Sequence, residues 1–176
     1  MNLDLSDSFF AVEGELELST KLLGGNTRDT ARKAAQILEK SNQGFIVPTI
    51  QQRQWLLVAF ARKGLTLYGK AFDIIKVNSE LDFSSEENVE KNVNSISICE
   101  IKSTNKVTVK DDFTGFFFSL STAELLTAQN LKSRYKFVLV NTLSKKFIEL
   151  SLKDIFFSLE RYLSFVECPV LVLNKH

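Results

Sequence analysis

A carboxylate and an ammonium group stand two residues apart in the stretch SISICEIKSTNK, at Glu100 and Lys102. The apolar residues around them predict a buried β-strand, and side chains two residues apart in a strand lie on the same face. The pair therefore shares its face with Ile96 and Ile98, where an isolated charge is costly. Two interpretations stay open: a structural pair that neutralises itself, or groups placed there for chemistry.

A second acid, Asp73, lies in another apolar segment, AFDIIKV. Alternation along a strand places it on the same face as Ile75 and Val77. If the two strands are neighbours, Asp73 and Glu100 converge on one cation, with Lys102 beside it. Two carboxylates and a backbone carbonyl suit Mg²⁺, which keeps several waters and accepts a phosphate oxygen. A nearby lysine can stabilise charge that develops on the phosphate, so the pattern favours metal-dependent phosphodiester hydrolysis.

The composition argues against several other kinds of catalytic site. The single histidine is His176, and the two cysteines are Cys99 and Cys168, which argues against a Ser-His-Asp triad, a Cys-His pair and a zinc cluster. A net charge of +1 neither requires nor excludes a nucleic-acid partner, although bases concentrate in KSTNKVTVK and LKSRYKF and predict a basic face. No apolar run approaches the length of a membrane span, and the start of the sequence lacks a basic signal region. We therefore expect a cytoplasmic protein without membrane partners.

The elements that must position these residues follow from periodicity and turn residues. Helices are predicted over 24–41, with Asn26 or Thr27 as cap, and over 49–64, with Thr49 as cap and Gly64 as stop. Residues 65–77 form two short strands or one strand bent at Gly69. The acidic stretch 78–92 is expected to be a mobile connection.

Further along the chain, strands are predicted over 95–103 and 114–121, the latter with Phe116, Phe117 and Phe118 in the core. A helix over 121–133 follows, with Ser121 and Glu124 at capping-box spacing. A strand over 134–142, an amphipathic helix over 151–166 and a last strand over 168–174 complete the chain. This order predicts an α/β fold with a mixed central sheet flanked by helices. We expect one domain over 1–176, with a mainly helical part at 1–64 and a sheet-containing core at 65–176.

In these segments the sequence resembles the PD-(D/E)XK nuclease superfamily, the fold of type II restriction endonucleases and many repair nucleases. The matching residues are Asp73 in GKAFDIIKV and the Glu-x-Lys of CEIKST, and the strand, helix and strand predicted in FFFSLSTAELLTAQNLKSRYKFVLVN follow as they commonly do there. The resemblance covers about 65–141. It departs from the family at residue 72, which is Phe where the motif has Pro, and the helix over 49–64 lacks the acid that many members supply.

The resemblance implies a restriction-endonuclease-like fold and a metal-dependent DNA endonuclease. Asp73 and Glu100 would be the ligands of Mg²⁺ or Mn²⁺, Ile101 would lend its backbone carbonyl, and Lys102 would be the catalytic lysine. It also implies a homodimer, because each domain carries one site whereas a DNA duplex has two strands.

Other residues are supporting candidates. Glu39, on the first predicted helix, is the one candidate for the missing helix acid, and Gln129 lies where some relatives place a glutamine near the site. Candidate contacts to nucleic acid are Ser103, Thr104, Lys106, Arg134 and Lys136. Two alternatives to a nuclease stay open: a non-catalytic nucleic-acid- or protein-binding module that keeps this fold, and a plain structural α/β protein in which Asp73 and Glu100 lie far apart.

Overall fold

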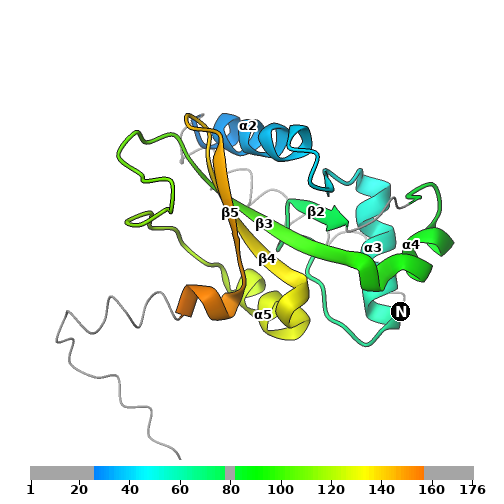
Figure 1. The fold of residues 1–176 in the computed structure, drawn as a ribbon. Helices are drawn as coiled ribbons and strands as arrows, with labels where there is room; N and C mark the ends of the chain where they lie inside the picture. Colours follow the sequence, from blue (N-terminus) through cyan, green and yellow to red (C-terminus); the bar gives the residue numbers. More distant parts are fainter. Residues whose placement is uncertain (1–25, 78–81, 157–176) are drawn as a thin grey trace, which may run out of the picture.

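A computed structural model describes residues 26–77 and 82–156 of the 176-residue chain (Figure 1). The elements, in chain order, are α2 (Asn26–Lys40), β1 (Phe45–Ile46), α3 (Ile50–Arg62), β2 (Ile74–Val77), α4 (Glu86–Asn92), β3 (Ile96–Thr104), α5 (Thr122–Leu131), β4 (Tyr135–Asn141) and β5 (Lys146–Leu150). Short 3-10 turns follow α4 and α5. The expected α/β class with a mixed sheet is confirmed.

The five strands form one sheet in the order β1-β2-β3-β4-β5. The pairings of β1 with β2 and of β2 with β3 are antiparallel, β3 and β4 are parallel, and β5 returns antiparallel to β4. A parallel pair needs a crossover connection, and the segment that contains α5 supplies it. The strand with the candidate site, β3, therefore lies in the middle of the sheet.

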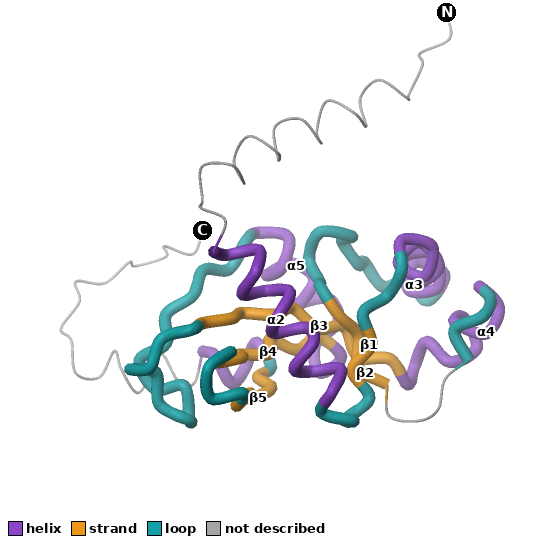
Figure 2. The backbone as a smooth tube through the Cα atoms, turned by 90° about the horizontal axis from the view of Figure 1, so that it is seen from above, coloured by secondary structure: helices purple, strands orange, loops and turns teal. Residues whose placement is uncertain are grey.

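The sheet separates two apolar layers. α2 lies across one face, as Figures 1 and 2 show, with Ala34 and Leu38 packed against Cys99 and Ile101. Side chains of α3, α4 and α5 pack on the other face against Ile98 and its neighbours. In Figure 1, α2 lies above the sheet and α5 below it. Both faces of the central strands are covered. A polar group on β3 therefore reaches solvent only where β3 has lost a neighbouring strand.

The predicted caps of two helices are confirmed, whereas Asn26 and Thr27, predicted as caps of the first helix, lie within α2. Thr49 caps α3 and exchanges hydrogen bonds with Gln52, while Ser121 and Glu124 form the capping box of α5. Such reciprocal bonds satisfy backbone donors that a helix start leaves without intrahelical partners. α3 ends at Arg62, and Gly64 follows with a φ of +71°, which suits the predicted stop.

Part of the acidic stretch predicted as a connection is a helix, so that prediction is wrong from Glu86 onward. Ser85 caps α4, and the acids Glu86 and Glu87 occupy its first turn. Negative charge in that position is favourable because the amino-terminal end of a helix carries positive partial charge. Val89 and Val93, four residues apart, are buried against the α3 side of the sheet. Residues 78–81 of the same stretch lie outside the described residues.

The strand predicted over 114–121 is also wrong, because these residues follow an irregular path. The rings of Phe116 and Phe118 contact each other, and Phe118 contacts Phe137 of β4, so their apolar surface is covered without strand pairing. Phe117, expected in the core, is 90% exposed. The segment 65–77 contains one short strand, β2.

Two strands were not predicted. These are β1, which has two residues, and β5, which pairs with β4 through the turn at 142–145. The start of the predicted helix over 151–166 is helical as far as residue 156. Its remainder and the strand predicted over 168–174 lie outside the described residues.

Candidate functional site

The pairing of β2 with β3 ends at Ile74 opposite Cys99, and Asp73 directly precedes it. The Asp73 backbone N–H donates to the Cys99 carbonyl at 3.0 Å, and its side-chain Oδ2 accepts from the Ile101 N–H at 3.0 Å. Asp73 thus holds its carboxylate against the edge of β3 where β2 stops. Asp73, directly before β2, therefore neighbours the strand that carries Glu100 and Lys102. This argues against the plain structural alternative, in which Asp73 and Glu100 lie far apart.

Glu100 and Lys102 share one face of β3, as alternation predicts. Lys102 Nζ donates to Glu100 Oε1 at 3.1 Å and to Glu124 Oε2 at 2.8 Å. Only 14% of the Lys102 side chain and 11% of the Glu100 side chain are exposed. A charge that deep needs compensation, and the lysine between two carboxylates provides it.

Glu124 is a site residue that sequence reasoning missed in this role. Its Oε2 also accepts from the Ser121 N–H at 3.1 Å, so one carboxylate both caps α5 and holds Lys102. The capping-box spacing identified the start of the helix but carried no information about what the helix packs against. The signal available in the sequence was an acid at the third position of a helix that follows a strand with a charged side chain.

Arg53 of α3 was also missed, and it fixes the segment that presents Asp73. Its guanidinium donates to the carbonyls of Phe72 at 2.8 Å and Asp73 at 2.7 Å, with a longer bond of 3.3 Å to Gly69. It also lies over the Phe72 ring, 4.3 Å from the centroid. The only signal in the sequence was a basic residue on a mostly apolar helix, with no partner nearby in the chain.

The charges at this site act strongly on one another. Burial raises the pKa of Glu100, and the negative charge of Asp73 raises it further, to about 8, while Lys102 acts in the opposite direction. Burial lowers the pKa of Lys102, but the hydrogen bond to Glu124 and the charges of both glutamates outweigh burial and raise it above its usual value. Lys102 therefore stays protonated at neutral pH, and Glu100 is held largely in its protonated form.

Asp73 opens onto a hollow of about 400 Å³ between α2 and the end of β1. It is lined by Ala31, Arg32, Ala35, Gln36, Glu39, Val47, Asp73 and Ile101. We call it the Asp73 hollow. Glu39 Oε1 accepts from the Val47 N–H at 3.3 Å, which places the helix acid in the same hollow as Asp73 and Ile101.

The donors at the edge of β3 are carboxylate and backbone oxygens, the set that Mg²⁺ or Mn²⁺ prefers. Burial and the charge of Asp73 both raise the pKa of Glu100, and a divalent cation held by the two carboxylates would offset both effects. Within residues 26–77 and 82–156, no group of three or more histidine, cysteine, aspartate or glutamate side chains is arranged to hold a metal ion. Any site would therefore rely on backbone oxygen and water beside the two carboxylates.

The remaining candidate residues lie further from Asp73. Ser103 and Thr104 end β3, and the Thr104 carbonyl accepts from the Thr142 N–H at 2.8 Å. Lys106 is exposed at the start of the loop that follows. Arg134 donates to the Val93 carbonyl at 2.5 Å and lies over the Phe60 ring, so it makes structural contacts.

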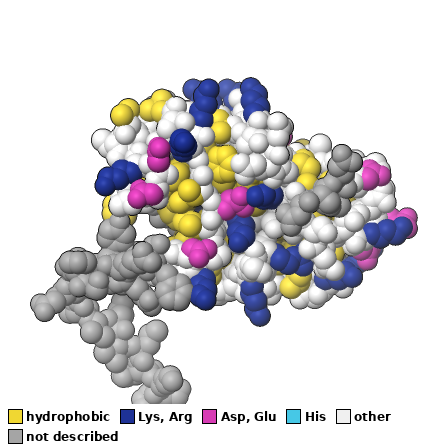
Figure 3. Space-filling view, viewed as in Figure 1, with side chains coloured by type: hydrophobic (Ala, Val, Ile, Leu, Met, Phe, Trp, Pro, Cys, Tyr) yellow, Lys and Arg dark blue, Asp and Glu magenta, His cyan; other side chains and the backbone are white. Residues whose placement is uncertain are grey.

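Gln129 and Lys136 line a separate hollow with Lys132 near the end of α5, and the structure does not bring them to Asp73. On the face of the molecule in Figure 3, lysine and arginine side chains gather at the upper edge over α2. Elsewhere on that face they are spread among acidic ones, so no single basic patch surrounds β3 there.

Comparison with known proteins returns no match: no protein-family model, no curated protein and no solved structure matches the chain. In the part of the chain that the structure describes, no helix is both long and apolar enough to cross a membrane. The geometry of Asp73, Glu100 and Lys102 is therefore the main indication of function.

Proposed function

We propose that this chain is a metal-dependent DNA endonuclease of the PD-(D/E)XK type. The observation that carries the proposal is the contact of Asp73 with β3 at Ile101, between Glu100 and Lys102 in the strand, where β2 stops pairing with β3. The connectivity supports it as well. An antiparallel arrangement of β1, β2 and β3 is followed by α5 and a parallel β4, so the helix and last strand that the resemblance implies are present, while 114–121 does not form the strand expected before them.

The residues have distinct tasks in this proposal. Asp73 and Glu100, with the Ile101 carbonyl, would hold Mg²⁺ or Mn²⁺, and Glu39 lies within the Asp73 hollow to support the ion or a water. When bound, the metal polarises the phosphodiester and lowers the pKa of a bound water. Lys102 stays protonated between its two glutamates and offsets negative charge on the reacting phosphate.

A non-catalytic module that keeps the fold is the second candidate. The observation in its favour is that Glu100 and Lys102 are nearly buried and already paired with each other. In an active enzyme Glu100 would hold the metal with part of its carboxylate turned from Lys102, and Glu124 would remain as the partner of the lysine. In an inactive module the pair would stay closed, and metal would have no effect on the protein.

Incubation of supercoiled plasmid with purified protein and Mg²⁺ or Mn²⁺ tests the proposal. We expect wild-type protein to nick or linearise the plasmid, and Lys102→Ala to slow cleavage by about 100-fold or more, since one charge-stabilising donor is typically worth that much. The matched control is Glu87→Gln, which removes an exposed charge on α4. Equal cleavage by wild type and Lys102→Ala, or none on linear, branched and single-stranded DNA with either metal, would contradict the proposal.

The homodimer implied by the resemblance belongs to the same proposal. One copy carries one candidate site, so a double-strand break requires two copies or two successive events. If two copies act together on one duplex, linear product should appear without accumulation of the nicked circle. A monomer would instead release the nicked circle first.

A further inference from the structure

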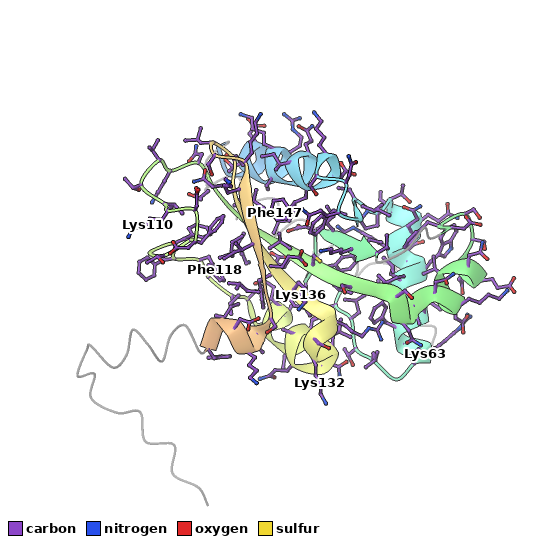
Figure 4. The ribbon with its side chains drawn as sticks, viewed as in Figure 1. Lys63, Lys110, Phe118, Lys132, Lys136 and Phe147 are labelled. Carbon is purple, nitrogen blue, oxygen red and sulfur yellow. The ribbon has the colours of Figure 1, made fainter. Side chains whose placement is uncertain are left out.

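A second hollow, of about 480 Å³, lies between α2 and the turn that joins β4 to β5. Its lining consists of Lys33, Gln36, Ile37, Lys40, Ser41, Thr142, Lys145 and Phe147. We call it the lysine hollow. Figure 4 shows Phe147 beneath α2.

The lysine hollow is strongly positive for its size. Lys33, Lys40 and Lys145 are exposed, and no acidic residue is among the residues that line the hollow. The Ser41 hydroxyl donates to the Leu38 carbonyl and the Thr142 hydroxyl to the Thr104 carbonyl, so the three lysines supply the donors of the hollow. Ammonium groups around a concave surface suit phosphate oxygens, and such contacts dominate the binding of proteins to nucleic-acid backbones.

α2 separates the lysine hollow from the Asp73 hollow. Lys33, Ile37 and Lys40 face one flank of the helix, Ala35 and Glu39 face the other, and Gln36 borders both hollows. A helix with its side chains is about 10–12 Å across. The major groove of DNA is about 12 Å wide. A duplex could therefore receive α2 in its major groove, with one backbone in each hollow.

We propose that the lysine hollow binds backbone phosphates of duplex DNA, on the strand across the major groove from the strand held at Asp73. This inference rests on the proposed nuclease function and adds how the substrate is positioned. A concave group of lysines suits the phosphates of a DNA backbone better than a lipid surface, because a bilayer contacts convex or planar basic faces. Lys33, Lys40 and Lys145 are positioning residues that touch the substrate far from the bond to be cut.

The test measures binding of a fluorescent duplex of about 25 base pairs by anisotropy in EDTA, so that cleavage plays no part. One variant carries Lys33→Gln, Lys40→Gln and Lys145→Asn. The matched control carries Lys63→Gln, Lys91→Gln and Lys132→Asn, which removes the same charge from exposed positions. Lys63 and Lys132 lie on the side of the molecule away from α2 in Figure 4. Lys145 and Lys132 both have positive φ, so each variant places one asparagine at a position with positive φ.

We expect the lysine-hollow variant to bind at least tenfold more weakly, with unchanged melting temperature, and the control to bind within about twofold of wild type. The slope of log affinity against log salt should also fall by about 0.9 for each phosphate that the variant no longer binds. Wild-type affinity in the lysine-hollow variant, or equal reductions of affinity in both variants, would overturn the inference. So would a variant that no longer binds anionic lipid vesicles and keeps its affinity for DNA.

Failure of this inference is distinguishable from failure of the nuclease proposal. Reduced affinity in a protein that never cleaves DNA supports the lysine hollow and removes the catalytic proposal. Cleavage by wild type together with unchanged affinity in the lysine-hollow variant does the opposite.

Discussion

Lys102 donates hydrogen bonds to side chains of two elements: Glu100 of its own strand and Glu124 at the start of α5. Because Glu124 Oε2 also accepts from the Ser121 N–H, the charge that holds the lysine and the cap that starts the helix belong to one side chain. A substitution that keeps the acceptor and removes the charge separates these two tasks.

Glu124→Gln makes that separation. We expect the cap to persist and the free energy of unfolding to fall by about 1–2 kcal/mol, because Lys102 keeps Glu100 as a partner. Cleavage should slow about tenfold, and its decline at alkaline pH should move to lower pH, because Glu124 helps to raise the pKa of Lys102. A pH–rate profile measures this shift. An unchanged profile with slower cleavage would mean that Glu124 acts only through the structure of α5.

Glu100 gives a pH dependence of stability whose sign can be worked out. Its pKa is about 8 in the folded protein and near 4.5 in an unfolded chain, so folding favours the protonated form. The stability that this provides is complete below pH 4.5 and is lost as the pH rises through 8. Each unit of separation is worth about 1.4 kcal/mol at most.

Glu100→Gln removes this titration. In metal-free buffer, we expect the advantage of the variant over wild type in free energy of unfolding to grow between pH 5 and pH 9. Urea unfolding at several pH values measures it. A difference that stays constant over this range would show that the carboxylate remains charged in the fold. Glu87→Gln, on an exposed part of α4, should show no such trend.

Glu100 and Lys102 share a face of β3, as alternation along a strand predicts, and Asp73 contacts the same strand at Ile101. Glu124 and Arg53 escaped sequence reasoning because their contacts span 22 and 20 residues and join different elements. Periodicity reports which face of an element a side chain occupies. It does not report which other element will cover that face.

At the scale of elements, the entry to β2 is tied down from two directions. Arg53 of α3 holds the carbonyls of Phe72 and Asp73, and the Tyr135 hydroxyl at the start of β4 donates to the Ala71 carbonyl. Burial of the tyrosine and of Ala71 makes this bond costly to lose. The position of Asp73 therefore depends on a helix before it and a strand far after it.

Tyr135→Phe leaves the Ala71 carbonyl buried without its donor. We expect the free energy of unfolding to fall by about 1–3 kcal/mol, the usual cost of an unsatisfied buried polar group. Urea denaturation measures the decrease, and Tyr68→Phe is the control because that tyrosine is largely exposed. Equal stability of Tyr135→Phe and wild type would show that the 71–73 segment relaxes and finds another donor.

The elements with strong local signals were predictable: α2, α3 and α5 by helical spacing and caps, β3 and β4 by apolar runs. α4 was missed because its acids suggested a solvated connection. Two buried valines and a serine cap instead stabilise a helix there. β1 is two residues long, too short to show alternation, and β5 carries charge on a half-buried edge. The triple phenylalanine suggested a strand because a run of aromatic residues is typical of a buried strand. The same residues can pack their rings against one another in an irregular segment.

At the scale of the whole molecule, metal binding should stabilise the folded state. A ligand that binds only the folded protein, at ten times its Kd, adds about 1.4 kcal/mol. For a chain of this size that corresponds to a rise of about 3–6 °C in melting temperature. Thermal unfolding with and without Mg²⁺ or Mn²⁺ measures it at pH 8.

We expect Asp73→Asn to abolish this rise and Glu87→Gln to keep it. A rise of the same size in both variants would place the metal elsewhere on the molecule. No rise in wild type, together with no cleavage, would favour the non-catalytic module. The measurement therefore separates the two candidate functions without knowledge of the DNA substrate.

Cys99 lies in the middle of β3, between β2 and β4, and is fully buried. Burial also raises the pKa of its thiol, which suppresses the reactive thiolate. In a Cys168→Ser background, a thiol reagent can modify Cys99 only when the sheet opens. The modification rate would then report the opening of the sheet beside Asp73 in the native protein. Slower modification with added metal would show that the ion closes the strands around it.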